Sequence, residues 1–579
     1  MKRVIVFVLI FAVLSGCSVK RKKTMGVSAD NKAAAGKVNF EREILISKRY
    51  LNIPVKNTRR KAEKDFVRFF VGGKMIQEFN LCYATDKVDW WAFVDVSDYM
   101  GKKLTVRLEG KEWNCDEDMD IIHQTDKIKG WRNLYKEKGR PQFHFTSRRG
   151  WNNDSNGLVY YKGLWHLFYQ HNPFSRNWGN MHWGHAVSKD ILHWEELGDA
   201  IYPNELGTIF SGSAVVDWKN SAGLQKGEEK TIVCFYTSAG GRNSWSKGKK
   251  YTQSIAYSTD GGRTFTPYEK NPVLGHIVGG NRDPKVFWHE ASGKWVMVLY
   301  LERPTLAFFV SDNLKDWEMT GKIDGFHECP ELFELPVDGD EGNKKWVLYG
   351  ASGDYFVGEF DGREFTPDGD IIKFTYGDCF YASQTWNDVP KEDGRRIQIG
   401  WARVDIPDMP FNQMMNLALE LTLRTTDEGI RMYAVPIREY ENLRGRKYSF
   451  ENEQLVEGEN LLEGIEGEFF DIVTEIEVGD AKYVGLNVRG VEIVYNVEKQ
   501  ELVGISKKKQ IAPVKAVDGK LRLRVLADRG IREVFANDGR IYMPLGRFTE
   551  TANKSLEVFA RGGNAKAISL DVYEMKSIW

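Results

Sequence analysis

Apolar and polar residues alternate along most of this chain, or the apolar ones form short runs bounded by turn residues. A two-residue period is typical of β-strands, so the pattern predicts an all-β protein. Strand-like apolar cores recur through the middle of the sequence, at residues 165–169, 231–236, 294–300, 345–349 and 396–401. Several are followed by a second strand that ends in a Ser/Asp turn and an aromatic residue.

Repeats of this length, each made of a few short antiparallel strands, are typical of the blades of a β-propeller. One blade cannot bury both of its faces alone, so the repeats are expected to pack around a central channel. We therefore predict a five-bladed β-propeller over residues 140–433.

Alternating regions also flank the repeats. Residues 37–126 predict an N-terminal β-sandwich-like domain, and residues 127–139 a linker. Residues 434–450 predict a partly helical connector, and residues 451–579 a C-terminal β-sandwich. In the first of these regions, Trp90-Trp91 favours core packing, with a carbohydrate-stacking pair as the alternative.

The first residues have the pattern of an export signal. A basic start precedes the apolar run Val4–Leu14, which is too short to span a bilayer stably. The small residues before Cys17 resemble a bacterial lipoprotein cleavage box. We expect a signal peptide over 1–16, lipidation at Cys17, a tether over 17–36, and anchoring to the outer membrane at the cell surface or the periplasmic face. A plain secretory signal is the alternative.

Charge and cysteine content exclude several classes of function. The chain carries 81 basic and 81 acidic residues, which removes the electrostatic argument for a nucleic-acid partner. Its six cysteines have no paired spacing, so neither a disulfide scaffold nor a zinc motif is indicated. His182, His185 and His193 have loosely metal-like spacing, but on alternating β sequence they are expected to pack or to bind hydroxyls. We expect no metal, no cofactor and a monomer.

Acidic residues recur just ahead of the apolar cores. Each such segment would be the innermost strand of its blade, and a propeller brings the starts of these strands together at one mouth of the channel. Four of the five segments supply an acid: Asp154, Asp283, Glu328 and, as a possible lining residue, Asp378. Any one of them alone could be a turn or a solvated residue. Their matching positions in a repeat favour a shared site.

Carboxylates without a histidine or cysteine ligand set suit hydrolysis of a glycosidic bond, which needs one ionised and one protonated carboxyl group. Asn153, Asn156 and nearby backbone amides can donate to an ionised Asp154. Glu328 has apolar neighbours in sequence, which would raise its pKa for the acid role. The Arg282-Asp283 pair could bind sugar hydroxyls and favour positive charge at the anomeric carbon.

Four sequence blocks carry a family resemblance. Residues 151–157, 210–213, 282–284 and 328–330 are similar, in this order, to the signature blocks of glycoside hydrolase family 32, which contains invertases, inulinases, levanases and fructan β-fructosidases. Supporting blocks lie at 141–145, 380–384 and 528–540. The resemblance covers Arg140 to the C-terminus. It implies a propeller followed by a sandwich, and retaining double displacement on β-D-fructofuranosides.

The resemblance also implies roles for single residues. Asp154 would be the nucleophile, Glu328 the general acid/base and Asp283 the transition-state stabiliser. The partner would be a fructose-containing oligo- or polysaccharide. The protein's pocket for the terminal fructose would be lined by Asn153, Gln170, Trp178, Phe210, Ser211 and Arg282, with Trp401 as a further candidate.

This chain departs from the family pattern at Ser155, where proline is usual, and at Asn152, where an apolar residue is usual. Loss of proline would loosen the turn that aims Asp154. Alternative functions are a fructan-binding or sensing lipoprotein without turnover, a fructosyltransferase, and an inverting arabinanase-like enzyme. The sequence leaves open levan, inulin or sucrose as substrate, and exo or endo action.

Overall fold

The computed structural model describes residues 40–57, 65–84, 87–109, 122–549 and 552–579. The predicted signal peptide, Cys17 and the tether lie outside these ranges. Strands dominate the described residues, whose helices are the 3₁₀ turns η2 (Ser97–Tyr99), η4 (Trp131–Asn133) and η5 (Arg438–Leu443). None of the helices in this part of the chain has the length and apolar character needed to span a bilayer. The all-β prediction is confirmed.

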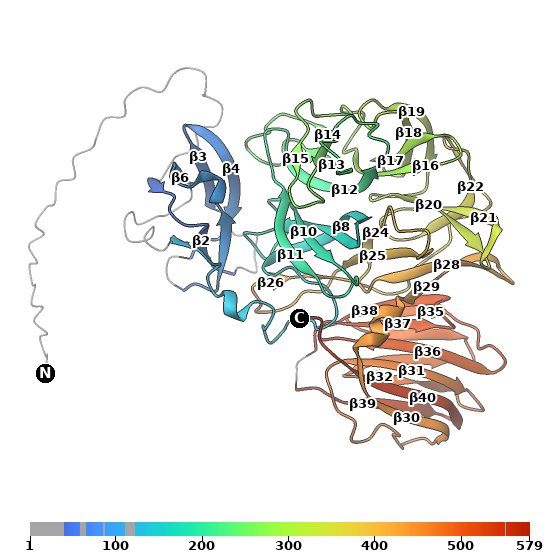
Figure 1. The fold of residues 1–579 in the computed structure, drawn as a ribbon. Helices are drawn as coiled ribbons and strands as arrows, with labels where there is room; N and C mark the ends of the chain where they lie inside the picture. The colour runs from blue at the N-terminus through green and yellow to red at the C-terminus, as the bar shows by residue number, and fades with distance from the viewer. Residues whose placement is uncertain (1–39, 58–64, 85–86, 110–121, 550–551) are drawn as a thin grey trace, which may run out of the picture.

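Five groups of four antiparallel strands surround a common axis, as the prediction of a five-bladed propeller requires (Figure 1). Blade by blade, they are β8 (Gly150–Tyr161), β9 (Leu164–Asn172), β10 (His182–Ser188) and β11 (Glu195–Ile201); β12 (Thr208–Asp217), β13 (Thr231–Ala239), β14 (Tyr251–Ser258) and β15 (Thr266–Pro267); β16 (Arg282–His289), β17 (Lys294–Glu302), β18 (Thr305–Ser311) and β19 (Glu318–Asp324); β20 (Glu331–Val337), β21 (Asp340–Tyr349), β22 (Tyr355–Phe360) and β23 (Phe365–Pro367); and β24 (Tyr381–Thr385), β25 (Arg396–Ala402), β28 (Leu419–Thr426) and β29 (Gly429–Pro436).

The first strand of each blade lies nearest the axis, where β8 contacts both β12 and β24, and β12 contacts β16. The ring is closed by the short strand β26 (Phe411–Asn412), which leaves the last blade and pairs in parallel with β8, Phe411 opposite Gly150. A further short strand, β27 (Met414–Met415), pairs with β25. Strand β8 is continuous from Gly150, so the polar segment around Asp154 is part of the inner strand and not a separate turn.

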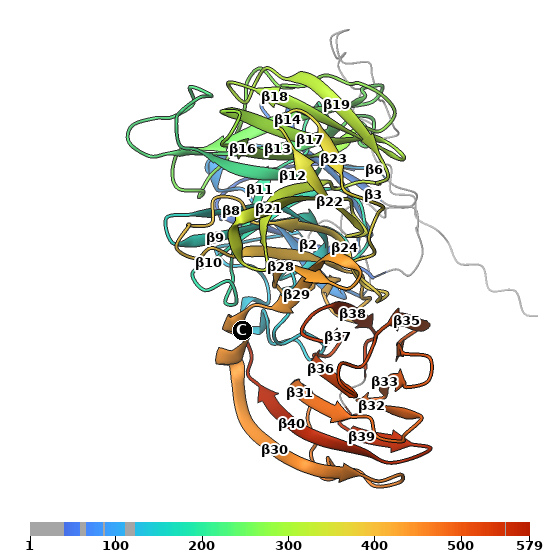
Figure 2. The ribbon, with the colours of Figure 1, turned by 90° about the vertical axis from the view of Figure 1, so that its right-hand side faces the viewer.

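The C-terminal residues form two stacked sheets below the propeller, with the apolar side chains between them (Figure 2). The sheets have the orders β30-β40-β31-β36-β37-β38 and β35-β34-β33-β32-β39. The helical part of the predicted connector is the 3₁₀ helix η5, and strand β30 begins directly after it, at Arg444. The strands are β30 (Arg444–Leu455), β31 (Phe470–Glu477), β32 (Tyr483–Val488), β33 (Val491–Asn496), β34 (Glu501–Ile505), β35 (Lys509–Pro513), β36 (Lys520–Ala527), β37 (Ile531–Ala536), β38 (Ile541–Gly546), β39 (Leu556–Arg561) and β40 (Ala565–Met575).

The N-terminal residues form two smaller sheets, β1-β6-β3-β4 and β5-β2-β7, which share one apolar core. Trp90 packs in this core and is 5% exposed, as the core-packing interpretation predicts. Trp91 is half-buried, with Lys129 Nζ 3.4 Å from its ring centroid. The strands are β1 (Phe40–Leu45), β2 (Tyr50–Val55), β3 (Asp65–Val71), β4 (Lys74–Leu81), β5 (Trp90–Asp95), β6 (Lys103–Glu109) and β7 (His123–Thr125).

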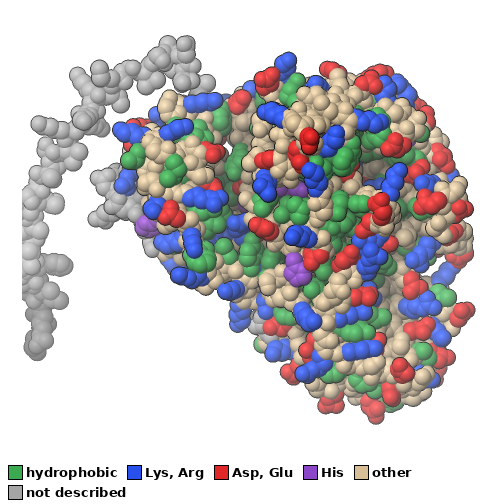
Figure 3. Space-filling view, viewed as in Figure 1, with side chains coloured by type: hydrophobic (Ala, Val, Ile, Leu, Met, Phe, Trp, Pro, Cys, Tyr) green, Lys and Arg blue, Asp and Glu red, His purple; other side chains and the backbone are tan. Residues whose placement is uncertain are grey.

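Acidic and basic side chains are interspersed over the face of the molecule in Figure 3, without a large area of one sign. This distribution follows from the equal numbers of acidic and basic residues in the sequence. This face therefore offers no broad positive area that would attract a polyanion.

Candidate active site

Four of the five inner strands are irregular where the predicted site residues lie. The pairing register shifts between Asn152 and Ser155 in β8 and between Phe210 and Gly212 in β12. It shifts again between Arg282 and Lys285 in β16, and between Tyr381 and Gln384 in β24. A β-bulge interrupts the alternation of side chains and turns one of them out of the sheet. The bulges therefore turn side chains such as Asp154, Ser211 and Asp283 toward the mouth of the channel.

Some residues of the site have a strained backbone conformation. Asp283 has φ +65°, Glu328 +57° and Cys329 +39°, all in the left-handed region that side chains other than glycine rarely adopt. Such residues cost about 1–3 kcal/mol each and persist where the surrounding fold forces them. Two of the three predicted catalytic carboxylates are therefore held at an energetic cost, which indicates a functional site.

The structure brings Asp154, Asp283 and Glu328 close together. The Cys329 thiol sulfur lies 3.5 Å from Asp283 Oδ2 and 3.8 Å from Asp154 Oδ2, so these two carboxylates are close neighbours. Arg282 lies between Asp283 and Glu328, with its Nε 3.7 Å from Asp283 Oδ2 and its Nη2 2.5 Å from Glu328 Oε1. We call this end of the channel, with its three carboxylates, the mouth.

Asp154 lies in β8 and accepts hydrogen bonds from the side chains of Ser211 and Asn153, in addition to the Cys329 thiol. Ser211 Oγ donates to Oδ2 at 2.6 Å and Asn153 Nδ2 donates to Oδ1 at 2.9 Å. Asn156 was also predicted to donate to this carboxylate, but its amide lies beside Ser211 and Gln170 instead. Burial raises the pKa of Asp154, the hydrogen bonds from Ser211 and Asn153 oppose that rise, and the charge of Glu328 adds to it.

Glu328 is in a polar environment, so the prediction of apolar surroundings was wrong. Its Oε2 accepts a hydrogen bond from the Tyr381 hydroxyl at 2.6 Å and lies 3.5 Å from His327 Nε2, and its Oε1 receives Arg282. Burial alone would raise the pKa of Glu328, but the hydrogen bonds from Tyr381 and Arg282 outweigh burial and lower it. Glu328 is therefore ionised near neutral pH in this structure.

Asp283 carries the strongly raised pKa instead. Burial, opposed by Arg282 and assisted by the charges of Glu328 and Asp154, raises its pKa to about 7. The side chain is 5% exposed, and the backbone N–H of Cys329 donates to it at 3.1 Å. Near neutral pH the mouth thus contains both protonated and ionised carboxyl groups, which is the requirement of acid/base chemistry.

The other predicted lining residues divide into two sets. Trp178 is 45% exposed and its ring lies 5.8 Å from that of Phe210, beside the mouth. Gln170, by contrast, is 2% exposed and donates to the Ile209 carbonyl at 3.0 Å, so its side chain joins β9 to β12. Trp401 lies against Trp151 and Tyr381, with ring centroids 5.9 and 6.3 Å away.

Comparison with known proteins agrees with this geometry. The "Glycosyl hydrolases family 32 N-terminal domain" matches residues 144–436, and the "Glycosyl hydrolases family 32 C terminal" domain matches residues 439–574. The chain belongs to glycosyl hydrolase family 32. Residues 40–143 lie outside both matched regions, so the N-terminal domain is an addition to the family core.

Individual relatives were also found. A levanase of Bacillus subtilis is 40% identical over 492 residues, which are 77% of this chain and 72% of that protein. An extracellular exo-inulinase of Aspergillus ficuum is 31% identical over 77% of this chain and 96% of that protein. The crystal structure of a β-fructofuranosidase from Schwanniomyces occidentalis with fructosyl-erythritol superposes with a TM-score of 0.68, at 28% identity over 76% of this chain and 98% of that one.

Two residues of the site were not predicted from the sequence as site residues. Tyr381 and Cys329 contact the carboxylates directly, yet they were noted only as parts of matching blocks. Tyr381 begins β24, the inner strand of the fifth blade, and that position in the repeat was the available signal. Asp378 points away from the mouth, since Gly546 N and Ser506 Oγ of the C-terminal sandwich donate to it.

The two departures from the family pattern are buried and hydrogen-bonded. Ser155 is 1% exposed, and its hydroxyl donates to the Ile399 carbonyl in the last blade at 2.9 Å. Asn152 is fully buried; with its amide oriented to satisfy both ends, the nitrogen donates to the Gln413 carbonyl at 3.0 Å. Both side chains thus join the first blade to the last part of the ring, a role that an apolar residue or proline could not perform.

The histidines with metal-like spacing do not converge on one point. His185 is buried and stacks on Phe168 at 4.0 Å between centroids, whereas His193 is on the surface beside Asp190. Burial lowers the pKa of His182 to about 4. Among the described residues no three His, Cys, Asp or Glu side chains are placed to hold a metal ion.

Proposed function

We propose that this family 32 glycosidase hydrolyses β-D-fructofuranosidic bonds of fructans, levan or inulin, through a covalent fructosyl-enzyme intermediate. The levanase and exo-inulinase relatives support the substrate class, as does the related structure that holds a fructosyl ligand. The observation that carries the proposal for this chain is the meeting of Asp154, Asp283 and Glu328 at one mouth.

In the first step the Asp154 carboxylate attacks the anomeric carbon of the terminal fructose, and the bond from that carbon to the leaving oxygen breaks. Glu328 gives its proton to that oxygen, which departs as an alcohol. In the second step water attacks the same carbon and gives its proton to the Glu328 carboxylate. The ester bond to Asp154 then breaks and the released sugar leaves, so that Asp154 is again a carboxylate and Glu328 is again protonated.

Glu328 must be protonated when the leaving oxygen departs, whereas hydrogen bonds from Tyr381 and Arg282 outweigh burial and lower its pKa in this structure. A sugar hydroxyl that accepts from the Arg282 guanidinium would take this contact away from Glu328. Loss of the contact would raise the pKa of Glu328 and favour its protonated form in the complex.

The experiment that tests this function is an Asp154→Asn substitution, assayed with levan and with inulin. Asparagine keeps the contacts to Ser211 and Asn153 but is not a nucleophile, so sugar release is expected to fall about 10³-fold or more. Circular dichroism and binding of an inert fructan oligomer should be unchanged. Residual turnover near the wild-type rate would contradict the assignment.

Chromatography of the wild-type products separates the remaining alternatives. Release of fructose or short fructans supports hydrolysis, whereas longer fructose chains formed at high sucrose would identify a fructosyltransferase. A binding or sensing protein would bind levan and release nothing. The ratio of rates on levan and inulin gives the preferred linkage, and the chain-length profile gives exo or endo action.

We further propose that the protein is exported, lipidated at Cys17 and anchored as a monomer to the bacterial outer membrane. The support is the signal pattern of residues 1–17 and the extracellular naming of the inulinase relative. Metabolic labelling with a palmitate analogue tests it. Wild-type protein should carry the label and fractionate with membranes, whereas Cys17→Ser should carry none. Label in that variant, or unlabelled wild type, would contradict the anchor.

A further inference from the structure

The N-terminal domain contacts the propeller beside the mouth. Strand β4 faces two propeller segments: residues 173–181, which join β9 to β10 and carry Trp178, and residues 240–250, which join β13 to β14 and carry Arg242. The side chains of Trp178 and Arg242 both lie near Phe210. The rings of Trp178 and Phe210 are 5.8 Å apart between centroids, and Arg242 Cζ lies 5.9 Å from the centroid of the Phe210 ring. We call Trp178, Phe210, Arg242 and Tyr251 the outer wall.

The outer wall is a connected set. Phe210 and Tyr251 lie 5.6 Å apart between ring centroids, and Arg242 Nε donates to the Tyr251 hydroxyl at 2.6 Å. Phe210 precedes Ser211, whose hydroxyl donates to Asp154. The wall is therefore continuous with the residues that hold the carboxylate proposed as nucleophile.

The first contact with the N-terminal domain is apolar. Phe174 belongs to the chain between β9 and β10, yet it is 1% exposed inside the core of the N-terminal domain. Its ring stacks on Phe79 of β4, with centroids 3.7 Å apart and planes 10° apart. Burial of a phenylalanine ring in another domain's core is strongly favourable, so this contact fixes one end of the segment that carries Trp178.

The second contact is a pair of hydrogen bonds at the other end of that segment. Asn180 Oδ1 accepts from the backbone N–H of Asn80, and Asn180 Nδ2 donates to the Asn80 carbonyl, at 2.9 and 2.7 Å. The amide therefore pairs with the edge of β4 as another strand would. Trp178 lies between Phe174 and Asn180, so both flanks of its segment are held by β4.

The third contact holds the other segment through a buried ion pair. Glu78 of β4 is 5% exposed and accepts from Arg68 Nε at 2.7 Å. It also accepts from the backbone N–H of Ser244 at 2.8 Å and from the Ser244 hydroxyl. A buried charge pair tolerates little displacement because each charge needs all of its partners. Ser244 is two positions from Arg242 of the outer wall.

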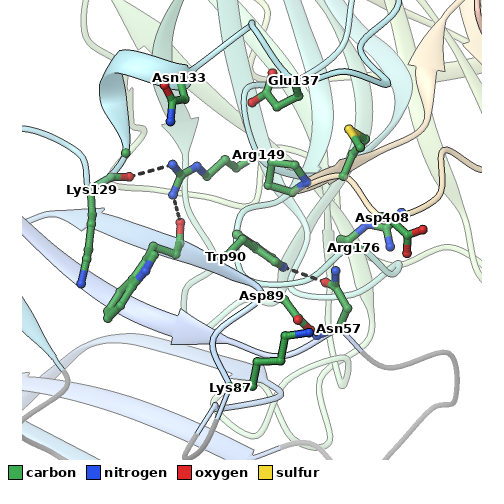
Figure 4. Close-up of a pocket in the computed structure, with 14 residues that line it drawn as sticks. Asn57, Lys87, Asp89, Trp90, Lys129, Asn133, Glu137, Arg149, Arg176 and Asp408 are labelled. Carbon is green, nitrogen blue, oxygen red and sulfur yellow. Dashed lines mark hydrogen bonds between the residues drawn. The ribbon is translucent and has the colours of Figure 1, made fainter. Parts of the chain in front are cut away.

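A fourth contact reaches the start of β8. Arg149 extends into the pocket of about 850 Å³ at the junction of the two domains, shown in Figure 4. Its guanidinium donates to the Lys129 carbonyl at 2.7 Å and to the Trp91 carbonyl. The next residue, Gly150, begins the strand that carries Asp154.

We propose that the N-terminal domain is a positioning element of the substrate site: by holding residues 173–181 and 240–250 it places the outer wall against the fructan chain. The inference rests on the proposed function, because the wall is assigned the same substrate. Trp178 and Arg242 would contact the sugars, and Asn180, Ser244 and Glu78 would act through them. The contacts through Asn180 and Ser244 support the binding of fructan and do not touch the three carboxylates.

The test is the double variant Asn180→Gly with Ser244→Ala in the full chain. Glycine tolerates the positive φ of 44° at position 180, so the substitution removes the side-chain contacts without backbone strain. Arg107→Ala is the matched control, since Arg107 pairs with Glu41 on the exposed side of the same sheet. Hydrogen exchange of residues 173–181 and 240–250 is measured first, and KM and kcat on fructan oligomers second.

In the double variant, exchange in both segments should increase, and KM for the oligomers should rise about tenfold, which corresponds to ~1.4 kcal/mol of binding. The value of kcat should stay within about twofold, because binding and not chemistry is weakened. The control should match wild type in every measurement.

Unchanged exchange in the two segments would overturn the inference, whether or not the enzyme is active. A fall in kcat with KM unchanged would overturn it as well, because the domain would then act on the chemistry or on general stability. Wild type that releases no sugar from fructan would instead contradict the proposed function, while the exchange measurement would still decide whether the domain holds the two segments.

Discussion

Two buried acidic clusters in this molecule use the same residue types for opposite purposes. The first is the mouth. The second, the junction cluster, consists of His144, Asp528 and Glu533 between the propeller and the sandwich. Asp528 accepts from the backbone of Phe143 at 3.0 Å and from His144 Nδ1 at 3.0 Å, and Glu533 lies 3.4 Å from His144 Nε2. All three side chains of the junction cluster are fully buried.

The difference lies in how many partners each charge has. Burial opposes the ionised form of Asp528, but hydrogen bonds from His144 and the backbone outweigh burial and lower its pKa. Burial likewise opposes the charged form of His144, but Asp528 and Glu533 raise its pKa to about 9. At the mouth, burial raises the pKa of Asp283 to about 7; the charge of Arg282 opposes this rise, and the charges of Glu328 and Asp154 add to it. The ionised groups of the junction cluster are paired and stabilise the fold. The carboxylates of the mouth outnumber their cationic partner, which lowers stability and leaves a carboxyl group that can exchange a proton near neutral pH.

The largest expected effect concerns the mouth. Glu328→Gln should lower turnover of levan about 10³-fold, because the leaving oxygen receives no proton. On an aryl fructofuranoside, whose leaving group needs no proton, the loss in kcat/KM, which reports the first step, should be about tenfold or less. Parallel kinetics on the two substrates measure this difference. An equal loss on both would mean that Glu328 is not the acid.

The next effect concerns the junction cluster. Asp528→Ala leaves His144 buried without its closest anion, and it should destabilise the fold by about 3–5 kcal/mol. Chemical unfolding at about neutral pH measures this loss. Any folded enzyme that remains should keep its KM, since the cluster does not touch the mouth. A variant of wild-type stability would show that pairing contributes nothing there.

Asp283→Asn should act in the opposite direction. The folded-state pKa of Asp283 is raised from 3.8 to about 7, so its contribution to stability is greatest below about pH 4 and is lost as pH rises through about 7. Asparagine removes this penalty, which is at most ~4 kcal/mol at about 1.4 kcal/mol per pH unit. The variant should lose activity and gain thermal stability near pH 8, with no gain near pH 4. Equal Tm values at both pH values would contradict the raised pKa.

The smallest effect is at Ser155. Ser155→Ala removes the hydrogen bond to the Ile399 carbonyl and leaves that buried acceptor unsatisfied, which should cost about 1–2 kcal/mol of unfolding free energy. Since Asp154 is the next residue, kcat should also fall about two- to fivefold. Ser155→Thr, which keeps the hydroxyl, is the control. A rate equal to wild type in Ser155→Ala would mean that the bulge alone aims Asp154.

The sequence predicted what is periodic or local. The five apolar cores correspond to the second strands β9, β13, β17, β21 and β25, and the acids ahead of them led to the mouth. The polar surroundings of Glu328 could not be predicted, because Arg282 and Tyr381 come from other blades and reach it only after bulges redirect the chain. For the same reason Asp378, at a matching point of the repeat, pairs with the sandwich instead.

The central claim is that Asp154 forms the bond to fructose while Glu328 handles the proton. Peptide mass spectrometry of the Glu328→Gln variant, quenched after mixing with an aryl fructofuranoside, tests it directly. Without the residue that activates water, the intermediate should accumulate, and a fructosyl adduct is expected on the peptide that contains Asp154. An adduct on Asp283, or turnover of the aryl substrate with inversion and no adduct, would contradict the account.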